Sequence, residues 1–417
     1  MKIEFVKKSR GVAILTVLIS LALMMAVVTE LSTKELVYYK LAINERDALM
    51  AEALAQSGAG FAQLILVVQE PLQSYLGNLA QMGIELPAYT VWELFPIDSD
   101  LLKGITDGSF IPDFGLNKDS KKENDDKKKA LISENKAKNV PLVGPYEAPE
   151  GGYGGFRGRF STEIEDEERK ISLRKWADHE PAKQKAIADQ ILSVLSKPEY
   201  AILFDGTLGN KNNMTPQRLV GNIYDYVSRE DRSVDMNAPK ERFGRDLVGD
   251  KRASYADMPG ILPKKAPMDT LAELRLVPGM TDAIYQVLSK VLTIYGESEK
   301  INILSASDEV VASLFYMCAK NRESSQLTRP EFAAEILQEW TRKKKEGAIK
   351  LTADGLISHL EESGVAVDKE ECQKSIGIES KTFTVKSTAT VGTVTKTLLV
   401  RLRSASGLTT LYQYQYL

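Results

Sequence analysis

Acidic side chains gather in one short stretch of this 417-residue chain. The four acids are Asp225, Glu230, Asp231 and Asp235. Carboxylate and carbonyl oxygens at such spacing are the ligands that calcium prefers. The loop lacks the regular alternation of an EF-hand, however, and Arg229 and Arg232 add positive charge. The stretch predicts either a calcium site or a turn of solvated carboxylates. A calcium-dependent rise in melting temperature that disappears in Asp231→Ala would support the first.

Catalytic chemistry has few candidate residues. His179 and His359 are the only histidines, and they lie in different polar contexts, too few for a typical histidine-based metal centre. Paired acids are common, but none lies in an apolar setting that would raise its pKa. The sequence therefore predicts no enzyme and no required cofactor, with calcium as the one possible ligand.

The two cysteines, Cys318 and Cys372, are an even and sparse complement. In an oxidising compartment they could form one disulfide, but two buried thiols fit the spacing equally well. The mass change on alkylation with and without reductant distinguishes the two.

The N-terminal residues are predicted to anchor the chain in a membrane, independently of the function of the rest of the chain. Residues 12–28 hold no charge, proline or glycine, and reach the short end of what spans roughly 30 Å of hydrocarbon as a helix. The preceding leader is basic and ends in Gly11, which favours a cytoplasmic N-terminus. A secretory signal peptide has its small-residue cleavage site after the apolar run, whereas Gly11 lies before it. The run is predicted to stay on the mature protein; an ordinary signal anchor is the alternative.

The helix continues beyond the apolar run. Apolar residues recur at threes and fours to about Glu70, just before Pro71, the first proline of the chain. Such a helix is about 88 Å long at 1.5 Å per residue. The run 57–60, Ser-Gly-Ala-Gly, marks close packing or a local bend in its second half.

The rest of the chain reads as strand, helix, strand. Residues 117–139 have the mixed charge of a solvated insertion, and glycine-rich 151–155 reads as a turn. Alternation at 160–164, a turn at 165–169 and resumption at 171–173 predict a hairpin. Helical patterns follow at 184–195, 216–228, 270–276, 281–292, 307–318 and 329–345. Strand character returns at 381–391, at 394–403 and near Tyr412. The simplest fold is one antiparallel sheet with a helical domain inserted between its strands.

These residues resemble the K-type minor pseudopilins of type II secretion systems, the GspK family. The basic leader with Gly11 resembles the class III leader of type IV pilins and pseudopilins. The G-R-F strand with its I-x-D-E turn, and the L-R-L-V-x-G-M-T and I-N-x-x-S/T-A-S phrases, resemble the K-type pattern. The resemblance implies that prepilin peptidase cleaves between Gly11 and Val12, and that Val12 is then methylated. Most pseudopilins carry Glu at the fifth position of the mature chain, whereas the K type lacks it. In this chain Thr16 occupies that position. A subunit unable to neutralise a neighbour's buried terminal ammonium is expected at a fibre tip.

The fold implied by this resemblance is α+β: a pilin-like long N-terminal helix packed on an antiparallel sheet, with a large all-α domain of helix-hairpin-helix or SAM-like type inserted between strands. The expected domains are a leader (1–11), a transmembrane segment (12–30), the periplasmic part of the long helix (31–70), the first part of the head (71–175), the helical insertion (176–372) and the C-terminal strands (373–417).

The function implied is a non-enzymatic one. The chain is expected at the tip of the pseudopilus, where it initiates or caps assembly for export across the outer membrane. The expected partners are the I- and J-type minor pseudopilins, the major pseudopilin, prepilin peptidase and the inner membrane, which it would cross once with its head in the periplasm. Family members are reported to bind calcium in the inserted domain, which adds to the interest of the acidic loop.

Two alternatives remain. One is a minor pilin of a type IV pilus, distinguished by whether the gene lies among secretion or pilus genes. The other is a membrane-tethered DNA-binding protein, because residues 274–281 and 301–310 look like helix-hairpin-helix modules. Pro278 removes one amide donor there, and Arg275 and Lys290 are the only nearby basic residues, which disfavours phosphate binding. No nucleic-acid partner is therefore expected, and filter binding at low salt tests this.

Overall fold

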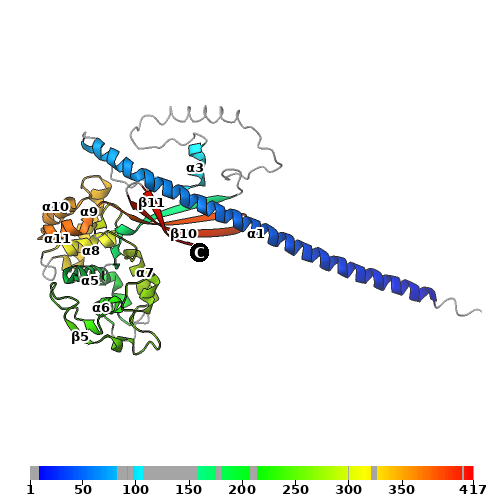
Figure 1. Cartoon of the computed structure of the whole chain (residues 1–417), viewed down its shortest axis with the longest axis horizontal. Helices are drawn as coiled ribbons and strands as arrows, with labels where there is room; N and C mark the ends of the chain where they lie inside the picture. The colour runs from blue at the N-terminus through cyan, green and yellow to red at the C-terminus, as the bar shows by residue number, and fades with distance from the viewer. Residues whose placement is uncertain are drawn as a thin grey trace, which may run out of the picture.

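A long helix, an antiparallel sheet and a cluster of short helices make up the molecule (Figure 1). The computed structural model describes residues 9–81, 92, 97–106, 158–174, 176, 180–206, 214–298, 300–320, 326–405 and 408–416. The leader residues 1–8, the charged segment 117–139, the glycine-rich run 151–155 and His179 lie outside the described residues.

Helix α1 (Ser9–Gln81) has 73 residues and is about 110 Å long. The expected end at about Glu70 is wrong, since the helix passes through Pro71. A proline removes one backbone hydrogen bond and crowds the preceding turn, which can kink a helix without ending it.

The two halves of α1 have different surroundings. Every side chain from Val12 to Ala42 is exposed. In the second half one face is buried, and its apolar residues are Ala51, Leu54, Ala55, Ala59, Ala62 and Leu66. Their spacing of three and four places them on one side of the helix, which packs mainly on β9 and β10.

The sheet has five antiparallel strands in the order β1-β2-β9-β10-β11. Their bounds are Ile97–Asp98, Arg159–Asp166, Thr382–Val391, Val394–Ala405 and Leu408–Tyr416. The three expected C-terminal strands are thus confirmed. Strand β2 pairs with β9, with Phe160 opposite Ala389, so strands on either side of the inserted domain are neighbours. The α+β class with an insertion between strands is also confirmed.

The predicted hairpin at 160–173 is wrong. Strand β2 ends in the 3-10 helix η1 (Glu167–Arg169), and the following strand β3 (Ile171–Ser172) pairs in parallel with β6 (Leu292–Thr293) instead. The chain leaves the sheet at this turn because the carboxylates at 166–168 are buried between the sheet and the inserted domain.

The inserted domain contains α5 (Pro181–Leu195), α6 (Pro216–Val227), α7 (Asp282–Val291), α8 (Asp308–Cys318), α9 (Pro330–Lys345), α10 (Ala353–Glu362) and α11 (Lys369–Ser375). The side chains that accept an N-terminal backbone N–H in these helices belong to Thr215, Thr281, Ser307, Thr352 and Asp368. Ser307 was the expected N-cap. Helices α10 and α11 were not predicted, and the helix expected at 270–276 is the 3-10 helix η4 (Leu271–Leu276).

Short strand pairs complete this domain. Besides β3 and β6, the described part contains β4 (Arg232–Val234) with β5 (Leu247–Asp250), and β7 (Ile301–Asn302) with β8 (Ile376–Gly377). The domain is therefore largely, but not wholly, helical. Its apolar core, from Ile171 to Ile376, is separate from the core between α1 and the sheet.

Candidate functional site

The exposed half of α1 is the first candidate site. Of the described helices, only the one over Val12–Gln69 is apolar enough to cross a membrane, with a mean hydropathy of 2.7 in its most apolar window. Apolar side chains remain exposed beyond the apolar run, among them Leu36, Val37 and Leu41. Such a length of uncovered apolar surface needs a bilayer or other helices around it.

The predicted cleavage point lies at the start of this helix. The described helix begins at Ser9, so the bond between Gly11 and Val12 falls in its first turn.

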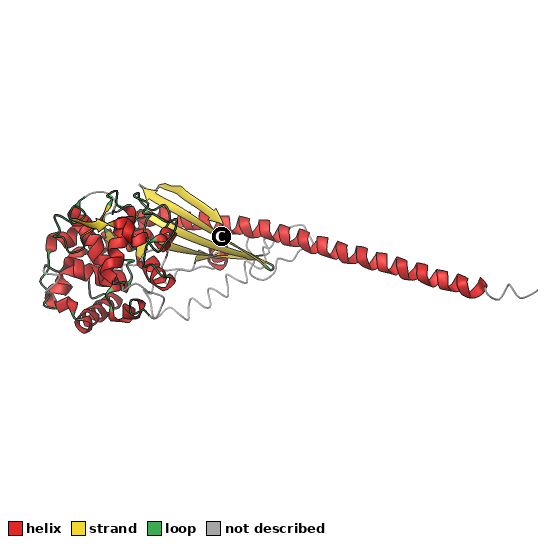
Figure 2. Cartoon of the chain, turned by 90° about the horizontal axis from the view of Figure 1, so that it is seen from below, coloured by secondary structure: helices red, strands yellow, loops and turns green. Residues whose placement is uncertain are grey.

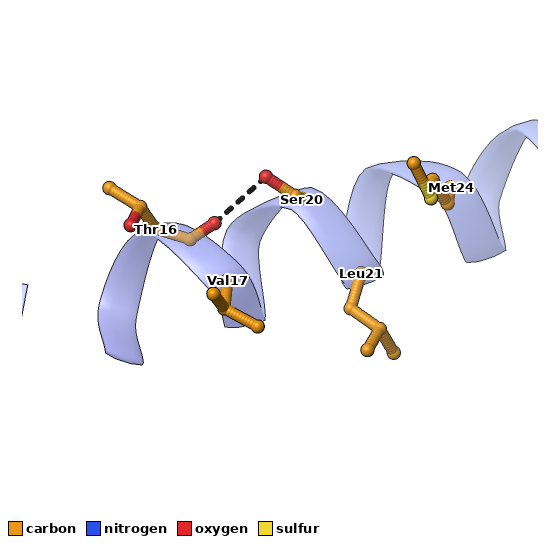
Figure 3. A pocket seen from close by; sticks show the side chains of 5 residues that line it. All are labelled: Thr16, Val17, Ser20, Leu21 and Met24. Carbon is orange, nitrogen blue, oxygen red and sulfur yellow. Dashed lines mark hydrogen bonds between the residues drawn. The ribbon is translucent and has the colours of Figure 1, made fainter. Parts of the chain in front are cut away.

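Thr16 carries no charge and satisfies its hydroxyl within the helix. Its Oγ1 donates to the carbonyl oxygen of Ala13 at 2.9 Å, one turn back. Ser20 Oγ donates in the same way to the carbonyl of Thr16 at 2.9 Å. Figure 3 shows a shallow pocket on this single helix, lined by Thr16, Val17, Ser20, Leu21 and Met24. With both hydroxyls internally bonded, this surface presents apolar atoms and no counter-charge.

The four acids of the predicted calcium site do not converge. Asp225 is buried at the end of α6 and accepts a hydrogen bond from the backbone N–H of Val234 at 2.9 Å. Asp231 is exposed and pairs with Lys265, which lowers the pKa of that carboxyl. Asp235 accepts the backbone N–H of Asn237 at 2.9 Å, and Glu230 is exposed.

A lysine lies at the centre of this loop instead. The Nζ atom of Lys251 donates to the carbonyl oxygens of Asp225 and Ser228, at 3.0 and 2.8 Å. Burial raises the pKa of Asp225 to about 6, although Lys251 and two hydrogen bonds act in the opposite direction. Within the described ranges no group of three or more His, Cys, Asp or Glu residues could hold a metal ion. The arrangement does not fit the expected calcium site, and calcium binding stays a prediction.

The segment that resembles a helix-hairpin-helix module packs inward. The carbonyl oxygen of Pro278 accepts a hydrogen bond from the buried Asn222 at 2.9 Å. Gly279 has φ of +86°, and any Cβ there would collide with Met214. Arg275 stacks on Tyr285, 4.0 Å from the ring centroid, and pairs with Asp282. These contacts agree with the interpretation of the turn as a packing unit.

Cys318 and Cys372 form a disulfide between α8 and α11. Their Cα atoms are 5.0 Å apart and both residues are fully buried. Of the two alternatives left open by the sequence, two buried thiols is therefore wrong. Closing a loop of 54 residues in the unfolded chain contributes about 4 kcal/mol in the chain-entropy picture.

His359 is a buried structural residue of α10. Its side chain lies between Trp340 and Phe315, with ring centroids 5.5 and 6.1 Å away. The Nε2 atom lies 3.0 Å from the carbonyl oxygen of Ile336, and Nδ1 has no partner among the described atoms. Burial lowers the pKa of this imidazole below its ordinary 6.5, so it is neutral in the folded protein.

Acid should therefore destabilise the inserted domain through His359. Below pH 6.5 the imidazole of His359 is protonated in the unfolded chain but stays neutral in the folded chain. The free energy of unfolding therefore falls as the pH drops towards the lowered pKa. We expect the free energy of unfolding to fall by about 1 kcal/mol more in the wild type than in His359→Gln between about pH 6.5 and 5. Denaturant titrations across this range measure the difference; equal slopes would contradict it. The raised pKa of Asp225 acts in the opposite direction, but it is common to both proteins and cancels.

A second site, at the junction of sheet and inserted domain, consists of three consecutive buried carboxylates. Asp166, Glu167 and Glu168 are 1, 3 and 2% exposed. Together they form what we call the carboxylate clamp. Burial raises the pKa of Asp166 and of Glu168, so the prediction that no paired acid lies in a setting that raises its pKa is wrong.

The carboxylate clamp bonds to both domains. Asp166 accepts hydrogen bonds from Asn302, at 2.9 Å, and from Ser305 and Ser380. Glu168 accepts the backbone N–H groups of Thr382, Lys381 and Glu297 at 2.9, 3.2 and 3.1 Å. Glu167 accepts from the hydroxyls of Thr293 and Thr384. The donors come from the inserted domain (293–305) and from the start of the sheet's second block (380–384), so the clamp fixes one against the other.

Sequence reasoning identified these residues only as a turn. A run of acids is usually solvated, and the donors lie more than a hundred residues away in the chain. One signal was available: the phrase I-N-x-x-S-A-S at 301–307 supplies Asn302 and Ser305 to Asp166 and Ser307 to the N-terminus of α8. Residues 301–310, which resemble part of a helix-hairpin-helix module, thus supply two hydrogen-bond donors to the carboxylate clamp.

The chain matches no protein-family model and no curated protein. Among solved structures it is similar to a chain of the GspK-GspI-GspJ complex from the type 2 secretion system of enterotoxigenic Escherichia coli. The match has 15% sequence identity and a TM-score of 0.41, and it covers 71% of this chain and 98% of that chain.

Proposed function

We propose that this chain is a K-type minor pseudopilin of a type II secretion system. In this proposal it has no enzymatic activity and lies at the tip of the pseudopilus, where it initiates or caps assembly. Prepilin peptidase releases its leader, the inner membrane holds α1 before assembly, and the head lies in the periplasm.

The observation that carries the proposal is the continuity of α1. One helix leads from an apolar run that fits a membrane, through an exposed stretch, onto the face of an antiparallel sheet. A simple anchor needs no rigid connection between bilayer and head. A fibre subunit does, because its helix must leave the bilayer and pack beside other helices while it keeps hold of the head.

Two features support a position at the tip. Thr16 offers no negative charge to a neighbour's terminal ammonium, which costs several kcal/mol to bury unpaired. The inserted domain lies at the end of the molecule opposite the protruding half of α1 (Figure 2). A further subunit added at the end of the molecule that carries the inserted domain would be blocked sterically by that domain. Subunits below it, the I- and J-type and major pseudopilins in this proposal, would meet only the exposed helix.

The disulfide supports the periplasmic location, because such bonds persist in oxidising compartments. The basic leader supports the same orientation.

The mature N-terminus tests the proposal directly. We expect mass spectrometry of protein purified from its own host to find a chain that starts at N-methyl-Val12. The Gly11→Leu variant should keep its leader, because the side chain fills the position that the peptidase requires to be small; Ser9→Ala, two residues earlier, should be processed normally. An intact Met1, or a start near residue 30, in the wild type would contradict the proposal.

Deletion of the gene separates the remaining alternatives. A pseudopilin is needed for secretion, so its loss should leave secreted proteins in the periplasm, restored by the wild type and not by Gly11→Leu. Loss of surface pili with normal secretion would favour the type IV pilus, and salt-sensitive retention of DNA by the purified protein would favour the DNA-binding alternative.

A further inference from the structure

Lys251 is a buried cation in the inserted domain, where a charged group has lost its hydration. It is the first residue of the 3-10 helix η3 (Lys251–Tyr255) and only 1% exposed. Removing an ammonium from water costs several kcal/mol unless oxygen atoms replace its hydration. The loop around it must therefore supply those oxygens.

The oxygens come from the end of helix α6. Lys251 Nζ donates to the carbonyl of Asp225, in the last turn of α6, and to that of Ser228, the residue that ends it. Carbonyls at a helix C-terminus lack intrahelical partners and carry partial negative charge. The carboxylate of Asp225 is buried nearby and attracts the ammonium. Two carbonyls and a carboxylate are the kind of oxygen set that otherwise surrounds calcium.

The same contacts close the loop. The carboxylate of Asp225 holds the backbone N–H of Val234 in β4, and Lys251 directly follows β5. Strands β4 and β5 pair with one another, so the ammonium ties the end of α6 to both strands of this hairpin. The backbone N–H of Lys251 adds a bond to the carbonyl of Asp231.

The remaining acids are committed elsewhere or exposed to solvent. Lys265 pairs with Asp231, and the carboxylate of Asp235 accepts a hydrogen bond from the backbone N–H of Asn237. A divalent ion beside Asp225 would also meet the positive charge of Lys251 at short range.

We infer that the ammonium of Lys251 is the cation of this loop, supplied by the chain itself, and that the head holds its fold without divalent metal. The lysine takes the place of a bound calcium ion: its ammonium binds the carbonyl oxygens of Asp225 and Ser228 at the end of α6 and attracts the buried carboxylate of Asp225.

Thermal unfolding of the full-length protein in detergent tests this, followed by the fluorescence of Trp176 and Trp340 in the inserted domain. We expect the wild-type midpoint to be the same, within about 1 °C, in EDTA and in about 5 mM calcium, which exceeds the dissociation constants of weak extracellular calcium modules. Lys251→Met should lower the midpoint by about 10 °C in EDTA, because it leaves a buried carboxylate and two carbonyls without their cation.

Lys265→Met is the matched control, since it removes a lysine that pairs with an exposed residue of the same loop, Asp231. It should shift the midpoint by no more than about 2 °C. A wild-type midpoint that rises by several degrees in calcium, or a Lys251→Met protein as stable as Lys265→Met, would overturn the inference. If Lys251→Met does not accumulate, calorimetric titration of the wild type with calcium decides: no binding heat supports the inference, and saturable binding overturns it.

Discussion

Gly58→Leu is expected to destabilise the packing of α1 on the sheet by about 3 kcal/mol, the upper end of what overpacking usually costs. Gly58 lies in close contact with strands β2 and β9. A Cβ there would lie 2.6 Å from Thr162 Oγ1 and 2.7 Å from Phe160 Cδ2, and closer still to Ser387 Oγ. Thr162 and Ser387 are hydrogen-bonded to one another at 3.0 Å and buried, so they cannot turn away freely. Trp92, whose ring contacts Phe383 in this core, reports the loss by fluorescence.

Gly60→Leu provides the control on the same helix. An added Cβ at Gly60 would have no atom within 4 Å, so the substitution meets open space. Glycine inside a helix is about 1 kcal/mol less favourable than alanine, so this variant should be as stable as the wild type or slightly more so. If Gly58→Leu and Gly60→Leu unfold at the same denaturant concentration, the close approach of helix and sheet does not carry the stability assigned to it.

Glu168→Ala should loosen the carboxylate clamp, with a loss of about 4 kcal/mol. The substitution leaves three backbone N–H groups, of Glu297, Lys381 and Thr382, without their acceptor at a buried junction. Each unsatisfied buried donor costs about 1–3 kcal/mol, and water that enters the gap recovers part of this. Because these donors belong to both domains, the sheet and the inserted domain should then unfold in separate transitions. The total tryptophan fluorescence should then change in two steps, because Trp92 lies in the core of the sheet and Trp176 and Trp340 lie in the core of the inserted domain.

Glu163→Ala is the control on the same strand. Its carboxylate is 75% exposed and pairs with Lys386 at 3.7 Å, a surface contact of at most about 1 kcal/mol. It should leave one joint transition close to that of the wild type. Coincident transitions in Glu168→Ala as well would argue that other contacts fix the two domains together.

Features that depend on neighbouring residues could be predicted from the sequence. Ser307 was identified as an N-cap because its hydroxyl serves an amide three residues away. The apolar periodicity predicted the helix α1 but not its buried face, because Leu49 and Leu64 are exposed and alanines form most of the face that packs on the sheet. The run 57–60 predicted close packing or a local bend, and the structure shows close packing at Gly58.

Features that depend on residues far away in the chain could not be predicted from the sequence. Alternation in β2 and its turn suggested a hairpin, because nothing local shows that β9, more than two hundred residues on, is the real neighbour. Asp166 and Glu168 looked solvated for the same reason. Lys251 was not considered for the acidic loop, since its partners are backbone carbonyls, which have no signature in the sequence.

The order of strands in the sheet has a consequence for how the protein is made. Three of the five strands, β9, β10 and β11, lie after the inserted domain in the chain. Helix α1 is made first, yet its face from Ala51 to Leu66 is covered mainly by the strands made last. The inserted domain, whose apolar core from Ile171 to Ile376 is complete before these strands emerge, can fold in the meantime and bring β2 near the place where β9 will arrive. The nascent protein therefore carries an uncovered apolar helix until β9, β10 and β11 have been made, and a chain cut short before residue 382 would keep the inserted domain but lack these three strands.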